Sequence, residues 1–176
     1  DPAGNAYVAG FTRSADFPVT TNIAFQVLHN RKTNSTTTAD AFLFRVSPAG
    51  LVDYATYFGG ESDDVAFNLV RDDAGALYLC GSTASTNFIL TATNISNTLA
   101  TNKGFADAFV TKFDSTLTNL IYSIAFGGPA RDEALDIAPD TLGRLVVVGD
   151  TLSTSLPVTN SGTFLRQTNS GSTDAF

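Results

Sequence analysis

The sequence predicts an all-β fold built from β-propeller blades, each a sheet of four antiparallel strands, because three short words recur along the chain. The first word, D-x-x-G followed by an apolar run, opens at Asp1, Asp72 and Asp140 and carries Gly4, Gly75 and Gly143. The word DAF begins at Asp40, Asp107 and Asp174, 67 residues apart each time, and FGG ends at Gly60 and Gly128. A fixed period along a whole chain indicates one supersecondary unit copied in tandem.

The most complete unit begins with two predicted strands joined by a tight turn. Val65–Arg71 is short and rich in apolar residues, and Leu77–Thr83 is a second run of the same kind. The link between them, Asp72–Gly75, has turn chemistry, because Asp bonds to its own downstream backbone and Gly accepts positive φ. These residues predict a β-hairpin.

Two more strands complete this unit after a long polar stretch. We expect the third strand at Ala108–Phe113, a turn at 114–119, and the fourth strand at Leu120–Phe126. Glu133–Ala138 then begins the next unit. Four short strands joined by turns and repeated are typical of a propeller blade. A helical solenoid would need apolar residues spaced by 3.6 positions, and the sequence has no such stripe.

The recurring words divide the chain into three parts. Residues 1–58 are expected to form a partial blade with strands two to four, 59–126 a complete blade, and 127–176 a partial blade with strands one and two and the start of three. We therefore expect about two and a half blades of a larger propeller, with an open β-repeat array as the alternative. The rest of its own chain or further subunits would complete the ring. On their own, residues 1–176 are expected to aggregate, oligomerise or remain partly unfolded.

Long insertions separate the second and third strands of every unit. They cover residues 13–39, 84–106 and 152–173, whereas hairpin loops usually take about 2–5 residues. Apolar residues recur inside them, so we expect them to fold down onto the blades: Phe17, Pro18, Phe25, Phe88, Ile89, Leu99, Leu156, Pro157 and Phe164. Because strands of a meander alternate in direction, the insertions share one face with the Gly-Gly links. This insertion face is the candidate binding face for a glycan or protein ligand.

Composition excludes several classes of function. The net charge is −7, which argues against nucleic acid and anionic membranes as partners. No run of 18 apolar residues is present, so no membrane insertion is expected. The single cysteine, Cys80, excludes an internal disulfide and is expected to be a buried apolar residue.

The order of the recurring words resembles the SBBP repeat, a bacterial seven-bladed-propeller repeat. The first copy supplies the matching residues Asp1, Gly4, Asn5, Tyr7, Val8, Gly10, Thr12, Ser14, Asp16, Phe17, Pro18, Asp40, Ala41, Phe42, Arg45, Gly50, Leu51, Tyr54, Thr56, Tyr57, Gly59 and Gly60. Later copies depart from it, with Ile89 in place of Pro and Arg144 in place of Asn. The resemblance extends along all 176 residues. It implies a secreted or cell-surface bacterial protein, and it implies no catalytic residues.

Repeated aspartates and glycines are the candidate site residues. Asp40, Asp107 and Asp174 precede the third strands, and Asp64 and Asp132 follow the Gly-Gly links. Aspartates at strand entries accept backbone N–H bonds, which would pin the loops between blades. Calcium is the alternative, since Ca²⁺ prefers oxygen ligands, but the sequence has no D-x-D-x-D-G spacing. The glycines inside strands, Gly10, Gly81 and Gly149, indicate a bulge or a close backbone approach.

No catalytic constellation is evident. The two glutamates, Glu61 and Glu133, occupy different repeat positions, and the only histidine, His29, lies in an unrepeated stretch. We therefore assign no catalytic, cofactor or metal residues. The function expected is a non-enzymatic extracellular scaffold or binding module, such as part of an adhesin or filament. The alternative is a propeller enzyme that cleaves polysaccharide through Asp residues of the insertion face.

Two asparagines fit the acceptor pattern for N-glycosylation. They are Asn34, in Asn-Ser-Thr, and Asn94, in Asn-Ile-Ser. Both lie in the long insertions.

Overall fold

The computed structural model confirms the all-β fold and its antiparallel blades. It describes residues 1–30, 37–91, 105–140, 142–156 and 172–176, and this part contains strands and turns but no helix. The strands form three antiparallel sheets, ordered β1-β2-β3, β4-β5-β6-β7 and β10-β9-β8. Their bounds are β1 Ala6–Thr12, β2 Asp40–Val46, β3 Val52–Phe58, β4 Asp64–Arg71, β5 Leu77–Thr83, β6 Asp107–Phe113, β7 Leu120–Phe126, β8 Asp132–Pro139, β9 Leu145–Thr151 and β10 Asp174–Ala175.

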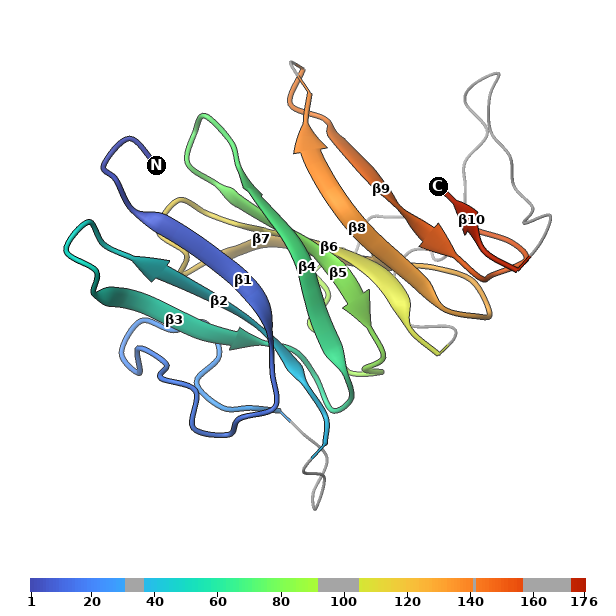
Figure 1. Ribbon diagram of the computed structural model, residues 1–176, viewed down its shortest axis with the longest axis horizontal. Helices are drawn as coiled ribbons and strands as arrows, with labels where there is room; N and C mark the ends of the chain where they lie inside the picture. The colour runs from blue at the N-terminus through green and yellow to red at the C-terminus, as the bar shows by residue number, and fades with distance from the viewer. Residues whose placement is uncertain (31–36, 92–104, 141, 157–171) are drawn as a thin grey trace.

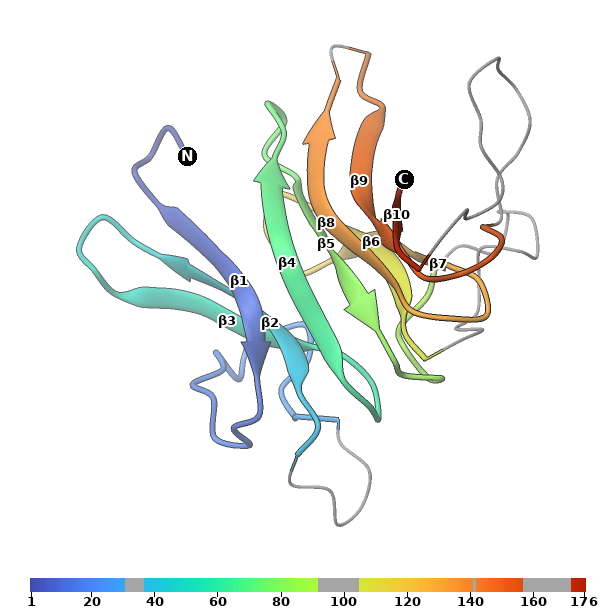
Figure 2. The ribbon, with the colours of Figure 1, turned by 45° about the vertical axis from the view of Figure 1, so that its right-hand side comes forward.

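The three sheets stand side by side like blades of a fan (Figures 1 and 2). β4 lies between β1 and β8, so the leading strands of the sheets line one face of the array. The Asp–Gly turns lie at the upper edge in Figure 1, and the Gly-Gly links lie at the opposite edge. The described parts of the insertions start and end at the strand ends beside these links, as the alternation of strand direction predicts.

The Asp–Gly turns have the geometry that their sequence predicts. Gly75 has φ +91°, a left-handed conformation that other residues rarely adopt, and its N–H donates to the Asp72 carbonyl at 3.0 Å. The Asp72 carboxylate accepts the N–H of Ala76 at 2.9 Å. Gly4 and Gly143 also have positive φ, at +82° and +77°, in the corresponding turns.

The glycines inside strands lie opposite β-bulges in the second and third sheets. The pairing of β4 with β5 skips Phe67, and a Cβ on Gly81 would lie 1.9 Å from the carbonyl oxygen of Val65. The pairing of β8 with β9 skips Leu135 in the same way, opposite Gly149. These glycines therefore permit the close backbone approach that the bulges require.

Two apolar clusters hold the sheets together. The first lies between the first two sheets and includes Leu43, Tyr54, Phe58, Leu79 and Phe109. The second lies between the second and third sheets and is built from smaller residues, including Cys80. Burial raises the pKa of this thiol to about 12, which is consistent with its predicted role as a buried apolar residue.

Several insertion aromatics pack onto the sheets, as predicted. The ring of Phe17 lies 4.9 Å from that of Phe42, and the ring of Phe88 lies 5.1 Å from that of Phe58. Phe25 joins the same cluster. Leu99, Pro157 and Phe164 lie outside the described residues.

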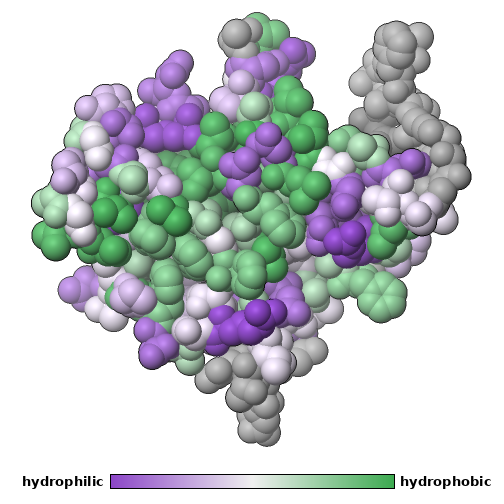
Figure 3. Space-filling view, viewed as in Figure 1, coloured by the Kyte–Doolittle hydropathy of each residue, from purple (hydrophilic) through white to green (hydrophobic). Residues whose placement is uncertain are grey.

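Apolar side chains gather over β1, β4 and β8 on the face shown in Figure 3. The exposed large apolar residues of these strands are Val8, Phe11, Phe67 and Leu135. The described part of the chain contains no helix that is long and apolar enough to cross a membrane.

Candidate functional site

A buried aspartate closes the Gly-Gly link that leads into the second sheet. Asp64 is fully buried, and its Oδ2 accepts the backbone N–H of Gly60 at 2.6 Å and the hydroxyl of Ser85 at 2.7 Å. The Ser85 oxygen in turn accepts the N–H of Ser62 at 2.8 Å. One carboxylate therefore ties the link between two sheets to the start of an insertion.

The same arrangement recurs at the entry to the third sheet. Asp132 is fully buried, and its Oδ2 accepts the N–H of Gly128 and the hydroxyl of Ser153, both at 2.7 Å. Its other oxygen accepts the hydroxyl of Thr151, and Ser153 accepts the N–H of Ala130 at 3.0 Å. We call the sets Asp64–Gly60–Ser85 and Asp132–Gly128–Ser153 the Asp–Ser latches.

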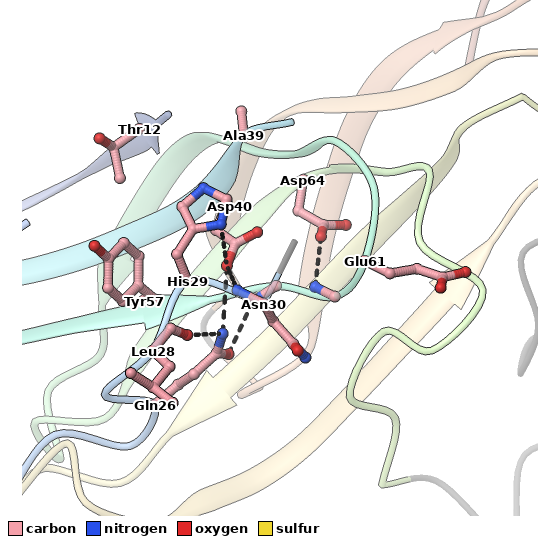
Figure 4. A network of polar contacts seen from close by, with 12 residues as sticks. Thr12, Gln26, Leu28, His29, Asn30, Ala39, Asp40, Tyr57, Glu61 and Asp64 are labelled. Atoms are coloured by element: carbon pink, nitrogen blue, oxygen red, sulfur yellow. Dashed lines mark hydrogen bonds and ion pairs between the residues drawn. The ribbon is translucent and has the colours of Figure 1, made fainter. Parts of the chain in front are cut away.

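In the first sheet, the aspartate at the start of β2 organises the insertion that precedes it (Figure 4). Oδ2 of Asp40 accepts the N–H of Asn30 at 2.7 Å and the side-chain amide of Gln26 at 3.3 Å. Nδ1 of His29 lies 3.7 Å from the same oxygen, and the imidazole is nearly inaccessible to solvent. Gln26 also accepts the N–H of Gly59 at 3.1 Å. Asp40 thus accepts a backbone N–H, as the sequence predicts for these aspartates.

The first glycine of each Gly-Gly link lies between carboxylates from two neighbouring sheets. A Cβ on Gly59 would lie 2.9 Å from Oδ1 of Asp40 and 2.8 Å from Oδ2 of Asp64, so these oxygens are less than about 6 Å apart. Only glycine fits this space without movement of a buried carboxylate. The arrangement recurs one unit later, where Gly127 lies between Asp107 and Asp132.

Burial sets the electrostatics of the first carboxylate pair. It raises the pKa of Asp64 to about 7, and the charge of Asp40 acts in the same direction, against hydrogen bonds such as that from Gly60. Burial also raises the pKa of Asp40, against the hydrogen bond from Asn30 and the nearby imidazole. Two buried carboxyl groups close to each other favour a state in which at least one is protonated.

The carboxylates converge on backbone rather than on an open coordination site. Gly59 and Gly127 occupy the space between the paired oxygens. Among the described residues, no group of three or more His, Cys, Asp or Glu side chains could hold a metal ion. The arrangement is suited to joining neighbouring sheets through backbone N–H groups and hydroxyls.

The remaining candidate residues are placed as follows. Asp107 is fully buried at the start of β6, and Asp174 lies half-buried at the start of β10, opposite Thr151. Asn34 and Asn94, the possible glycosylation sites, lie outside the described residues.

Sequence reasoning missed the hydroxyl partners of the latches. The strands β1, β5 and β9 each end at a threonine that begins a Thr-x-Ser sequence. The serines of these sequences are Ser14, Ser85 and Ser153. In all three, the serine N–H donates to the threonine hydroxyl at 3.0–3.1 Å. This recurring spacing could have identified them. Gln26 and His29 lie in a stretch whose sequence does not recur, so the repeat offered no signal for their contacts.

Two hollows lie between the second and third sheets. The first, which we call the apolar groove, has a volume of about 440 Å³ and is lined by Val110, Tyr122, Ile124, Phe126, Gly143, Leu145 and Val147. The second has a volume of about 500 Å³ and lies between the Asp–Gly turns, beside Arg71, Asp72 and Asp140.

Comparison with known proteins does not assign the site: no family model matches the chain, and no curated protein matches it.

Proposed function

We propose that this chain is part of a β-propeller that serves as a non-catalytic scaffold or binding module of a secreted or cell-surface bacterial protein. The observation that carries the proposal is that three of the recurring aspartates are buried and hydrogen-bonded to backbone. Asp40, Asp64 and Asp132 are fully buried. Asp64 and Asp132 hold backbone N–H groups of the Gly-Gly links between sheets, and Asp40 holds the N–H of Asn30 in the first insertion. Carboxylates used in this way stabilise blade junctions and do not reach a substrate.

The insertion face is the proposed ligand-binding face. Loops carry recognition because they tolerate variation while a rigid scaffold positions them. Here the latches and Asp40 fix the roots of the insertions, and Phe17 and Phe88 anchor them to the sheets. The resemblance to the SBBP repeat supports an extracellular or surface location, where a glycan or protein would be the ligand.

A propeller enzyme acting on polysaccharide is the second candidate, because one pair of carboxyl groups has features of an acid–base pair. Asp40 and Asp64 approach within about 6 Å, and burial raises the pKa of Asp64 to about 7. Retaining glycosidases place their carboxyl groups about 5–5.5 Å apart. Full burial of both side chains favours the structural role.

A combined binding and turnover experiment tests the proposal. The chain is screened on a glycan array, and the same glycans are assayed for cleavage with wild type, Asp64→Asn and, as a control, Asp73→Asn in an exposed turn. We expect binding without cleavage. Cleavage that is lost in Asp64→Asn and retained in Asp73→Asn would reverse the preference and favour the enzyme.

A further inference from the structure

The first insertion pairs with the outer edge of β3, the last strand of its sheet (Figures 1 and 2). The N–H of Thr20 donates to the carbonyl of Ala55 at 3.0 Å, and the N–H of Ala55 donates to the hydroxyl oxygen of Thr20 at 3.0 Å. Further along, the N–H of Tyr57 donates to the carbonyl of Gln26 at 3.1 Å. The insertion therefore pairs with backbone groups of β3 that face away from β2.

The second insertion makes the same contact with β7, the last strand of the second sheet. The N–H of Thr91 donates to the carbonyl of Ser123 at 3.1 Å, and the N–H of Ser123 donates to the hydroxyl oxygen of Thr91 at 2.7 Å. Ser123 stands 68 residues after Ala55, the repeat distance of the Gly-Gly links. In both sheets one threonine acts as a residue of an added antiparallel strand, with its hydroxyl in place of a carbonyl.

An aromatic residue three positions earlier anchors each threonine. The ring of Phe17 lies 4.9 Å from that of Phe42, and the ring of Phe88 lies 4.9 Å from that of Phe109. Phe42 and Phe109 are the phenylalanines of the recurring word DAF. The anchor and the threonine therefore recur together, although the intervening residues differ.

We call the segments 17–20 and 88–91 the edge straps. They read Phe-Pro-Val-Thr and Phe-Ile-Leu-Thr, and the sequence returns to Leu-Pro-Val-Thr at 156–159, which lies largely outside the described residues. The straps contact Ala55 and Ser123, the central residues of two seven-residue strands. A strap at the centre leaves too few outward-facing groups on either side for a continuous ladder.

A strand edge without such cover is a template for pairing with another chain, because it presents N–H and carbonyl groups at every second residue. The outer edge of one blade is also complementary to the same edge of a second copy, since two identical edges can pair antiparallel about a two-fold axis. A second copy of this chain is therefore the partner that an uncovered edge would accept.

We propose that the edge straps close the outer edge of each blade against strand pairing with a second copy of this chain. The threonine engages both backbone groups of the central residue, and the aromatic anchor holds the threonine in place. Copies of the chain then meet through their blade faces and not through their outer edges. The inference goes beyond the proposed function and holds whether or not the insertion face binds a ligand.

The variant Thr91→Pro opens one strap, because proline lacks both the hydroxyl and the N–H that pair with Ser123. Hydrogen-exchange mass spectrometry at single-residue resolution reads the result. The N–H of Ser123 faces outward, whereas those of Tyr122 and Ile124 face β6. In dilute protein, exchange at Ser123 should become at least about tenfold faster, the effect of one lost hydrogen bond or more, and exchange at Tyr122 and Ile124 should not change.

Raising the protein concentration tests the blocking role. In Thr91→Pro, a second copy should pair with the opened edge, so exchange at Ser123 should slow again as the concentration rises. Wild type and Thr91→Ser, which keeps the hydroxyl and the N–H, should show no such dependence. Thr86→Val is the matched control, because the Thr86 hydroxyl lies in the same insertion but donates to Glu61, at 2.8 Å. It should behave as wild type, which separates edge pairing from association through blade faces.

Two results would overturn the inference. Unchanged exchange at Ser123 in dilute Thr91→Pro would mean that the strap does not hold the edge. Fast exchange at Ser123 at every concentration would mean that the opened edge accepts no second copy. Ligand binding or catalysis by the insertion face would change neither readout, so the proposed function is tested separately.

A second variant covers the case in which Thr91→Pro does not fold, which faster exchange throughout β7 would reveal. Thr20→Pro then opens the strap of the first sheet, with Ala55 as the outward reporter and Tyr54 and Thr56, which pair with β2, as internal controls. The same concentration dependence is expected at Ala55, and its absence would overturn the inference.

Discussion

At the residue scale, the recurring aspartates and glycines form one device that joins neighbouring sheets. Each Gly-Gly link places its second glycine N–H on an aspartate and its first glycine between two carboxyl groups. A buried carboxylate without partners would destabilise the fold, but these accept backbone and hydroxyl donors. The regular spacing of these aspartates and glycines along the chain therefore reflects packing and hydrogen bonding at the junctions between sheets.

Gly59→Ala tests this crowding. The added methyl group would lie within 3 Å of both the Asp40 and the Asp64 carboxyl groups, so we expect a loss of about 3 kcal/mol in the free energy of unfolding. Gly143→Ala is the matched control, since Gly143 has φ +77° and open space around its Cβ position. Its left-handed backbone should cost about 1–2 kcal/mol. Urea denaturation at a fixed protein concentration measures both, and equal losses would contradict the crowding argument.

Asp64→Asn tests the electrostatics of the same junction. Folding raises the pKa of Asp64 from its ordinary value near 3.8 to about 7, so the fold favours the protonated acid. The stability that this group contributes is complete below pH 3.8 and is lost as the pH rises toward 7. Relative to Asp64→Asn, wild type should therefore lose on the order of 4 kcal/mol across this interval. Asp73→Asn, in an exposed turn, should follow the wild-type curve. Parallel curves for all three proteins would refute the buried-acid argument.

At the element scale, bulges explain the glycine within the second strand of the unit in two of the three sheets. In the second and third sheets, the bulged strand brings a carbonyl oxygen within about 2 Å of the position that a Cβ would take at Gly81 or Gly149. On β1, by contrast, the nearest atom to a Cβ at Gly10 is a ring carbon of Phe42, at 3.0 Å. The same sequence position therefore carries different steric demands in different sheets.

Alanine substitutions should distinguish a glycine that faces a bulge, such as Gly81, from one that faces only a side chain, such as Gly10. Gly81→Ala forces a methyl group against backbone, which cannot give way as a side chain can, so we expect a loss of about 3 kcal/mol or more. Gly10→Ala meets only the tip of a phenyl ring and should cost about 1 kcal/mol. Thermal unfolding followed by circular dichroism compares them. A loss at Gly10 as large as that at Gly81 would mean that the bulge is not the reason for the glycine.

Sequence reasoning located the strands well because every unit provides an independent copy of the same signal. The expected strand Val65–Arg71 gained only Asp64, and Ala108–Phe113 gained only Asp107. Those two residues were missed as strand residues because aspartate is unfavourable in strands, and here burial and hydrogen bonding override that tendency. The bulged residues Phe67 and Leu135 were missed because a bulge depends on the partner strand, which local sequence does not specify.

The candidate site was only partly predictable for the same reason. Aspartates that accept backbone N–H bonds followed from residue chemistry and repeat position. The pairing of Asp40 with Asp64 across Gly59 did not, because it joins two sheets and depends on how they pack. The contact between His29 and Asp40 depends on the path of the first insertion, in a stretch whose sequence does not recur.

At the scale of the whole molecule, apolar packing runs continuously from sheet to sheet and then reaches two outer faces. Phe17, Phe42 and Phe44 stack together on the first sheet, on the side away from the second. Val146 and Val148 of β9 are about half exposed on the far side of the third sheet. Interiors of this kind gain stability from each neighbour that covers a sheet face, so both outer faces favour association.

We therefore expect the 176-residue chain, expressed alone, to self-associate or to remain partly unfolded. Size-exclusion chromatography with light scattering should report species larger than one chain. Val146→Asp combined with Val148→Asp should shift the distribution toward monomer, because charged residues on an exposed strand oppose edge and face pairing. Ala49→Asp adds a charge in an exposed turn away from these faces and should leave the distribution unchanged. A wild-type chain that is a monodisperse monomer with a sharp, cooperative thermal transition would show that the outer faces need no partner.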